Sequence, residues 1–309
     1  MDYTEFARRL GEEQLKRRLR RQADHVAELV HQGEGILRLE EYIDVDALTV
    51  FLLKAVGLYR RGHCNFLDLR VVGHEFRIAE LPLSLEGFRL LQLSDLHLDL
   101  DHSLTPILQR QLQELDYDLA VLTGDYRNCT RKDFRPCLDE TAKVLAALKP
   151  PVFGILGNHD FIEMAPGLEA AGLRLLLNES VLLTHQDANL FLAGIDDPHF
   201  YRTHDMARAS RGKPPGATAI LLSHSPETYR SAEAAGYQVM LSGHTHGGQI
   251  CLPGGIPILR VGRCPSRMLA GGWRFGSLQG YTSPGTGSTG VPVRFSCPPE
   301  ITIHTLRAA

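Results

Sequence analysis

Five short apolar runs in this chain each end at aspartate, histidine or asparagine, and this repeated pattern constrains the fold more than any other feature. Each run holds four or five residues, a length typical of a buried strand. Stretches with helical spacing separate them, and strand–helix alternation at about thirty residues per unit indicates βαβ units. The runs are Leu90–Leu93, Leu119–Thr123, Val152–Leu156, Ala219–Ser223 and Val239–Ser242.

The remaining main-chain pattern adds strands with fewer helices. Residues 68–79 alternate in the manner of a strand, and between residues 173 and 195 the spacing shortens to that of hairpins. After Cys251 glycine and proline become frequent and the pattern is β-like. These features predict an α/β fold, two-layered or sandwiched, with strands of mixed direction.

Residues 1–67 are predicted to form a helical segment ahead of a domain that spans residues 68–309. One interpretation is a helix packed on the domain with a solvated basic face. The other is an interfacial helix drawn to anionic lipid headgroups, although six acidic residues among the first thirty weaken it. The helical pattern consists of apolar residues among lysines and arginines, at Leu15, Leu19, Ala23, Val26 and Val30.

Charge and cysteine usage narrow the classes of function. A formal net charge of −3 lacks the basic excess of proteins that grip nucleic acid, and argues against such a partner. Six cysteines without a CxxC pair predict reduced thiols and no sulfur-ligated zinc site. Neither an export signal nor a stretch able to cross a bilayer is evident, so a cytoplasmic protein is expected. No obligate protein partner is evident from the sequence either.

The residues that end the five runs are of the types that bind metal ions. Carboxyl ends of strands in open α/β sheets converge, so these side chains are expected to meet. Two carboxylates, four histidines and one asparagine carbonyl exceed one mononuclear site and suit two ions that share a carboxylate. Without thiolates, these ligands favour Mn²⁺, Fe or Zn²⁺. The candidates are Asp95, His97, Asp125, Asn158, His224, His244 and His246.

In chain order the motifs read Asp-x-His, Gly-Asp, Gly-Asn-His-Asp, His and Gly-His-x-His, and this order resembles the calcineurin-like metallophosphoesterase superfamily. Residues 243–249, Gly-His-Thr-His-Gly-Gly-Gln, and the tail from Tyr281 to Ile301 look like a bacterial subgroup of single-domain phosphoesterases that are often membrane-associated. The likeness covers about residues 75–306. It implies two mixed β-sheets sandwiched and flanked by helices, and hydrolysis of phosphoester bonds with two divalent metal ions, Mn²⁺ foremost.

The resemblance also assigns roles. It leaves His159 as a catalytic group that is not a ligand and that stabilises or protonates the leaving oxygen. Two adjacent dications activate water for in-line attack on phosphorus. The implied ligands are Asp95, His97, Asp125 and His246 for one ion, and Asp125, Asn158, His224 and His244 for the other, with Asp125 bridging.

One departure bears on the substrate. Many relatives read Gly-Asp-x-x-Asp, whereas here Asn128 stands at the second aspartate. Asn128 is expected to hydrogen-bond the ring of His159 without stabilising an imidazolium as a carboxylate does. A pyrophosphate or nucleotide leaving group needs that acid less. We therefore expect a phosphodiester or pyrophosphate substrate, a phosphorylated small molecule or a nucleotide-linked lipid precursor such as UDP-2,3-diacylglucosamine.

Several alternatives stay open. They are a general phosphomonoesterase, a nuclease of the same fold and a non-catalytic metal-binding scaffold. Every expected ligand position is kept, which argues against the scaffold, and no added DNA-binding domain is visible. The polar loop 196–204 either rims the active site or is a plain surface loop. If the substrate is a lipid, contact with the inner membrane through the N-terminal helices is expected.

Overall fold

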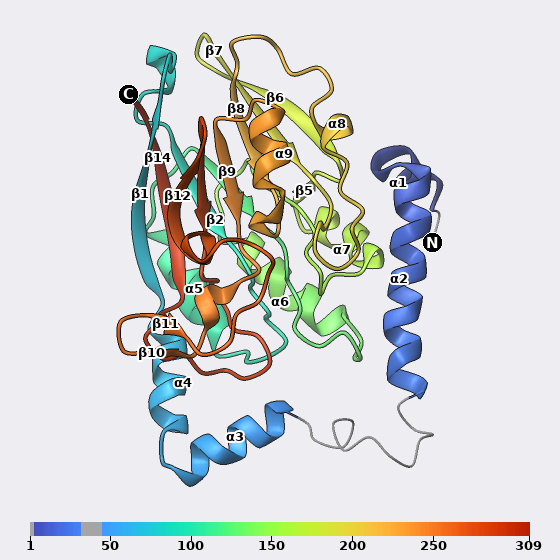
Figure 1. Cartoon of the computed structure of the whole chain (residues 1–309), viewed down its shortest axis with the longest axis vertical. Coiled ribbons are helices and arrows are strands. Elements are labelled where there is room, and N and C mark those ends of the chain that lie inside the picture. Colours follow the sequence, from blue (N-terminus) through green and yellow to red (C-terminus); the bar gives the residue numbers. More distant parts are fainter. Residues whose placement is uncertain (1–2, 32–44) are drawn as a thin grey trace.

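The computed structural model describes residues 3–31 and 45–309, with the side chains of residues 25–31 and 45 also outside the description. Two six-stranded sheets and a small two-stranded ribbon make up the β-structure of the described residues, with helices around them (Figure 1). This mixed α/β arrangement of two flanked sheets confirms the fold class expected from the sequence.

Sheet A carries the first three predicted strand runs, and it is mixed because β14 runs antiparallel to β2. Its strands β2 to β5 are parallel to one another. In spatial order the strands are β1 (Arg70–Ile78), β14 (Glu300–Ala308), β2 (Arg89–Leu93), β3 (Leu119–Leu122), β4 (Val152–Gly154) and β5 (Arg174–Leu175).

Sheet B carries the other two runs, on parallel neighbours β8 and β9 at its centre. Antiparallel strands close both of its edges. In spatial order the strands are β12 (Gly271–Phe275), β13 (Leu278–Thr282), β9 (Val239–Ser242), β8 (Thr218–Leu222), β7 (Ala188–Gly194) and β6 (Glu179–His185). The ribbon pairs β10 (Cys251–Leu252) with β11 (Ile256–Pro257).

Alternation along the strands explains why the sheets stack. On β3, Leu119 and Val121 belong to the apolar cluster that the two sheets share. Ala120 and Leu122 belong to a second cluster, with side chains of α5 (Leu104–Gln113), α6 (Arg135–Leu145) and α7 (Ala165–Ala170). A third cluster covers the outer face of sheet B with α8 (Met206–Ala209) and α9 (Tyr229–Ala234). Strands buried on both faces read as continuous apolar runs.

Four helices precede β1: α1 (Thr4–Leu10), α2 (Glu12–His31), α3 (Val45–Ala55) and α4 (Tyr59–Leu67). The first two share the core of the main domain, because Phe6, Leu10 and Leu15 are buried in the cluster that covers sheet A. One basic side chain of α2 also turns inward: the guanidinium of Arg18 is buried and pairs with Asp196, whereas Lys16, Arg17 and Arg20 are exposed. For α1 and α2 the structure therefore has the packed arrangement.

Two parts of the sequence pattern lie outside the described residues, namely residues 32–44 of the helical segment and the side chains of Val26 and Val30. Among the helices that are described, none combines the length and apolar character needed to cross a membrane.

Candidate metal centre

The five strand ends meet where the carboxyl ends of β2, β3 and β4 face those of β8 and β9. Two main-chain groups join the sheets there: the amide of His244, after β9, donates to Asp95 Oδ2, after β2, at 3.0 Å. The ring of His224, after β8, donates from Nδ1 to the carbonyl oxygen of Thr123, after β3, at 2.8 Å. The structure thus brings the seven predicted ligands together, and we call them the strand-end site.

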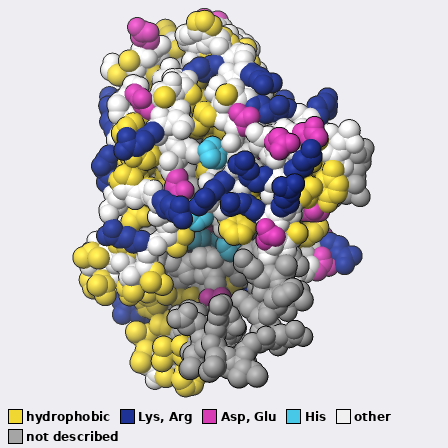
Figure 2. Space-filling view, turned by 45° about the vertical axis from the view of Figure 1, so that its right-hand side comes forward, with side chains coloured by type: hydrophobic (Ala, Val, Ile, Leu, Met, Phe, Trp, Pro, Cys, Tyr) yellow, Lys and Arg dark blue, Asp and Glu magenta, His cyan; other side chains and the backbone are white. Residues whose placement is uncertain are grey.

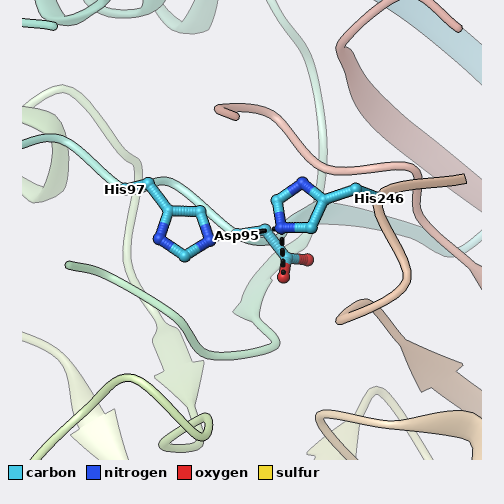
Figure 3. Close-up of side chains that lie close together, drawn as sticks. All are labelled: Asp95, His97 and His246. Carbon is cyan, nitrogen blue, oxygen red and sulfur yellow. Dashed lines mark hydrogen bonds and ion pairs between the residues drawn. The ribbon is translucent and has the colours of Figure 1, made fainter. Parts of the chain in front are cut away.

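The first group in this site is Asp95, His97 and His246, whose side chains point toward one another from two loops, Asp95 and His97 after β2 and His246 after β9 (Figure 3). One ligand atom from each lies within 4.8 Å of the others. The two Nε2 atoms of His97 and His246 are 3.2 Å apart, and His246 Nε2 lies 3.5 Å from Asp95 Oδ1. Converging imidazole and carboxylate atoms of this kind can hold a divalent ion.

The second group is Asp125, His224 and His244, again within 4.8 Å by their ligand atoms. Nε2 of His224 lies 3.2 Å from Asp125 Oδ2 and 2.9 Å from Asn158 Oδ1. Nε2 of His244 is buried and has no hydrogen-bond partner among the described residues. A buried nitrogen left without a partner is costly, and a metal ion at this group would satisfy it.

Asp125 belongs to the second group and also approaches the first. Its Oδ2 is 3.2 Å from His224 Nε2 in the second group and 3.8 Å from His97 Nε2 in the first. The same carboxylate accepts the main-chain amide of His159 through Oδ1, at 2.8 Å. The carboxylate of Asp125 therefore lies within 4 Å of an imidazole nitrogen of each group.

Backbone carbonyls fix which ring nitrogen faces the site. His97 donates from Nδ1 to the carbonyl of Arg127, at 2.7 Å, as His224 does to Thr123. Because a carbonyl only accepts, each Nδ1 carries the hydrogen, and a lone pair is left on Nε2 of the neutral ring. In the neutral form that a metal ligand requires, both rings therefore present the Nε2 lone pair to the site.

The backbone of the site is held in a conformation that residues with side chains rarely adopt. Five predicted ligands have φ in the left-handed region, at a cost on the order of 1 kcal/mol or more each. Such strain persists only where the surrounding structure imposes it, and it concentrates at functional sites. The angles are 52° for Asp95, 44° for His97, 57° for Asp125, 71° for His244 and 51° for His246.

Two glycines are required because the site loops approach closely. A methyl group at Gly157 would lie 2.1 Å from Asp125 Oδ1. One at Gly243 would lie 1.8 Å from Ser94 Oγ. Any larger residue at either position would displace a loop that carries a ligand.

Asp160 holds two of the loops together without being a ligand. One of its carboxylate oxygens accepts the amides of Gly157 and Asp125, both at 2.8 Å, and the other accepts the amide of Tyr126 at 2.9 Å. Sequence reasoning included Asp160 in a motif but gave it no role. Its position after Gly-Asn-His was the available signal.

The C-terminal tail supports the loop of Asp95. Amides of Thr286 and Gly287 donate to the carbonyls of Ser94 and Asp95, at 2.7 and 2.9 Å. The buried guanidinium of Arg294 in turn binds the carbonyls of the tail, including that of Pro284 at 2.7 Å. The tail motif noted in the sequence is thus a brace for the site.

Charges in the site are strongly coupled. Burial raises the pKa of Asp95 to about 6 and lowers the pKa of His97 to about 4. Burial opposes charge at Asp125 as well, but the neighbouring His224 and His159 hold the pKa of its carboxyl well below the usual range. Burial also disfavours a charged His224, yet Asp125 raises its pKa to about 10. The carboxylate of Asp125 therefore favours positive charge beside it, as a cation site requires.

His159 is the predicted catalytic residue that is not a ligand, and it lies beside both groups. Its Nε2 is 4.0 Å from Asp125 Oδ2, and its ring meets that of His97 edge-on with centroids 5.0 Å apart. The ring is partly exposed, with 27% of the side chain accessible. It can therefore reach a substrate oxygen from outside the buried ligands.

The expected contact from the Asn128 side chain to His159 was wrong. His159 Nδ1 donates to the main-chain carbonyl of Asn128, at 2.8 Å. The side-chain oxygen of Asn128 turns away and accepts the amide of Gly290 at 2.9 Å. The tail brings an amide donor to this position, and sequence patterns gave no sign of it.

Some residues of loop 196–204 stabilise the fold, and another borders the strand-end site. Asp196 pairs with Arg18 from α2, and Asp197 accepts main-chain amides of its own loop, so both serve the fold. His199 instead lies against His244, with ring centroids 4.2 Å apart, and its Nδ1 is 2.7 Å from Glu227 Oε1. His199 and Glu227 border the second group, and Glu227 was missed by sequence reasoning.

The comparison with known families decides the identity. The calcineurin-like phosphoesterase model matches residues 88–248, which carry all seven members of the strand-end site. The chain belongs to this family. It is therefore a metal-dependent hydrolase of phosphoester bonds, as the resemblance implied, and its Asp and His clusters are suited to divalent metal ions.

Curated relatives of this phosphoesterase agree. It is 30% identical over 270 residues to the uncharacterized metallophosphoesterase YkoQ of Bacillus subtilis, covering 84% of this chain and 98% of YkoQ. It is 29% identical to the phosphodiesterase YaeI of Escherichia coli, covering 74% and 86%. It is 30% identical to a zebrafish (Danio rerio) transmembrane protein with a metallophosphoesterase domain, covering 78% of this chain and 58% of that protein.

Proposed function

We propose that this phosphoesterase hydrolyses a phosphodiester or pyrophosphate bond with two divalent metal ions held at the strand-end site. The observation that carries the proposal is the position of Asp125, whose carboxylate reaches both groups of nitrogen ligands. The proposed ligands are those of the two groups with Asn158 added to the second, and Mn²⁺ is the proposed metal, with Fe and Zn²⁺ as alternatives.

Bound divalent ions supply Lewis-acid chemistry: they lower the pKa of water and neutralise charge on phosphoryl oxygens. The protein supplies the arrangement. Carbonyls of Arg127 and Thr123 orient His97 and His224, Asp160 fixes the loop of Asp125, and the strained backbone keeps the ligands converging. Because the ligands are already held in place, the protein does not have to rearrange them during the reaction.

His159 is the proposed proton donor. With Nδ1–H donated to the Asn128 carbonyl, the ring exchanges its other proton at Nε2, the atom nearer the strand-end site. A neutral carbonyl supports the charged ring less than a carboxylate does. Because this support is weak, a phosphate or nucleotide leaving group, which departs as a stable anion, suits the enzyme better than a simple alcohol does.

The finer proposal is a nucleotide-linked lipid precursor such as UDP-2,3-diacylglucosamine, cleaved between its two phosphates at the membrane surface. It is supported by the phosphodiesterase name of one relative and the transmembrane name of another. We also propose that residues 1–67 act with the domain of residues 68–309 as an accessory segment. The buried side chains of α1 and α2 tie that segment to the domain.

The test is a panel of substrates with the full chain, since removing α1 would take Phe6 and Leu10 from the core. With Mn²⁺ and detergent, we expect hydrolysis of bis(p-nitrophenyl) phosphate and of UDP-2,3-diacylglucosamine, and weak hydrolysis of p-nitrophenyl phosphate. Efficient cleavage of the monoester with neither diester nor pyrophosphate cleaved would overturn the proposal in favour of a phosphomonoesterase.

A further inference from the structure

Large apolar side chains are exposed mainly at one end of the molecule. Of thirteen such residues that are exposed in the described part of the chain, ten belong to two segments, residues 45–61 and 252–263. We call these two segments the apolar end. Phe51 in the first segment and Leu259 in the second are the most exposed of the ten.

The two segments are far apart in sequence, but the residues that adjoin them, Gly62 and Cys251, both lie against Phe295 of the tail. In α4, a methyl group at Gly62 would lie 2.7 Å from the ring of Phe295. At the start of β10, the amide of Cys251 donates to the carbonyl of Phe295 at 2.9 Å. Figure 1 places α3, α4, β10 and β11 together at the lower end, and Figure 2 shows hydrophobic side chains gathered there.

Exposure at this end is too extensive to be incidental. Scattered single apolar residues are normal on a protein surface, whereas contiguous groups mark an interaction site. Phe51 is 66% exposed and Leu259 74% exposed. No described residue of either segment is buried, so the rest of the described chain leaves these apolar faces uncovered.

The charge of the apolar end is basic although the whole chain carries −3. Its only carboxylate is Asp46. None of its five cations forms an ion pair with another described residue, and all five are exposed. They are Lys54, Arg60, Arg61, Arg260 and Arg263.

From this combination we infer that the apolar end docks on an anionic lipid bilayer, its apolar side chains entering the headgroup boundary and its cations meeting lipid phosphates. Interfacial binding scales with buried apolar area and with attraction to anionic headgroups, and both are present. A second copy of the chain fits less well. In a two-fold contact through this face, the five cations of one copy would face the five cations of the other and repel them.

The docking surface leads directly to the strand-end site. At the end of segment 252–263, a methyl group at Gly262 would lie 3.7 Å from His244 Cδ2. The amide of Arg263 donates to Glu227 Oε1 at 2.7 Å, and Glu227 also contacts His199. This step rests on the proposed function: a lipid-linked phosphoester held in the bilayer would meet the site where the docked loop ends.

The experiment is co-sedimentation of the full chain with vesicles of phosphatidylglycerol and phosphatidylcholine, beside vesicles of phosphatidylcholine alone. We expect binding to the anionic vesicles, weakened by salt. The double variant Phe51→Asp with Leu259→Asp should bind at least about tenfold more weakly. The matched control is Leu83→Asp with Leu182→Asp, two exposed leucines outside the apolar end, which should bind as the original chain does.

Three outcomes would overturn the inference: no binding to anionic vesicles, equal loss in both double variants, or a dimer that only Phe51→Asp with Leu259→Asp dissociates. Hydrolysis of bis(p-nitrophenyl) phosphate, measured on the same samples, separates this inference from the proposed function. Vesicle binding without hydrolysis would refute the function and support the surface. Hydrolysis without vesicle binding would do the reverse.

Discussion

The strand-end site and the apolar end are neighbours built on opposite principles. In the first, polar side chains are buried, carbonyls orient the rings of His97 and His224, and backbone strain is imposed by the surrounding loops. In the second, apolar side chains such as Leu259 are exposed and cations such as Arg260 lack an ion pair among the described residues. The first region is preorganised for ions and the second for a large external surface, so substitutions should separate the two functions.

The largest effect is expected from Asp125→Ala. Losing the carboxylate that reaches both groups should release the metal ions and lower turnover by at least about 10³-fold, since metal charge stabilisation is worth several kcal/mol. Metal analysis and hydrolysis of a soluble diester are the measurements. Vesicle binding by the apolar end should be unchanged. Two ions retained per chain would show that the ligand assignment is wrong.

His159→Gln should keep the metals and lower turnover by about 10²–10⁴-fold, the range of positioned acid–base groups. We expect the lower end, because a carbonyl and not a carboxylate supports the ring. The loss should be smaller for substrates with acidic leaving groups, measured over a series of aryl diesters. An equal loss across the series would contradict the acid role.

Asn128→Asp is the matched control for His159. Its side chain faces the amide of Gly290, so the new carboxylate should keep that bond and change turnover less than about tenfold. A large gain on substrates with poor leaving groups would mean that the carboxylate reaches the ring of His159 after all.

Arg18→Ala tests how much the buried ion pair of Arg18 with Asp196 stabilises the fold. It would leave the carboxylate of Asp196 buried without its partner, which costs about 3–5 kcal/mol. Urea unfolding should show this loss, and the added change Asp196→Ala should recover part of it. The exposed Phe51→Asp, by contrast, should shift the free energy of unfolding by less than about 0.5 kcal/mol. A similar loss of unfolding free energy in Arg18→Ala and Phe51→Asp would show that the buried and the exposed side chains do not differ in their contribution to stability.

The smallest effect is expected from acid acting on a single buried histidine outside the strand-end site, His304. Burial holds the pKa of His304 well below its usual range, so the folded state favours the neutral ring. The resulting stability is present above the unfolded pKa of about 6.5 and is lost as pH falls toward the folded value. Between pH 6.5 and 5 this one group contributes up to about 2 kcal/mol.

His304→Gln should flatten that part of the pH dependence, as measured by urea unfolding at several pH values. Segment 252–263 has no histidine or carboxylate, so vesicle binding should vary little over the same range. An unchanged pH dependence of stability in His304→Gln would show that another group carries it.

Much of the site could be predicted because every ligand lies two to four residues after the end of a buried strand. Asp95 and His244 come within two residues of the ends of β2 and β9, so strand ends alone place them. The partners of those ligands were not predictable. Glu227 reaches His199 across 28 residues, and Asn128 meets Gly290 across 162, since both contacts depend on how distant loops fold.

By itself the sequence determined the α/β class, the strand runs and the set of residues that converge, because strand period and the polar residues at strand ends are local properties. Only the tertiary structure decided whether α2 or α3 is covered by the rest of the domain. Helix α2, rich in arginine, buries Arg18 against Asp196, whereas the more apolar α3 exposes Phe51. Burial depends on which surfaces the folded chain brings opposite a helix, and no local pattern in the helix contains that information.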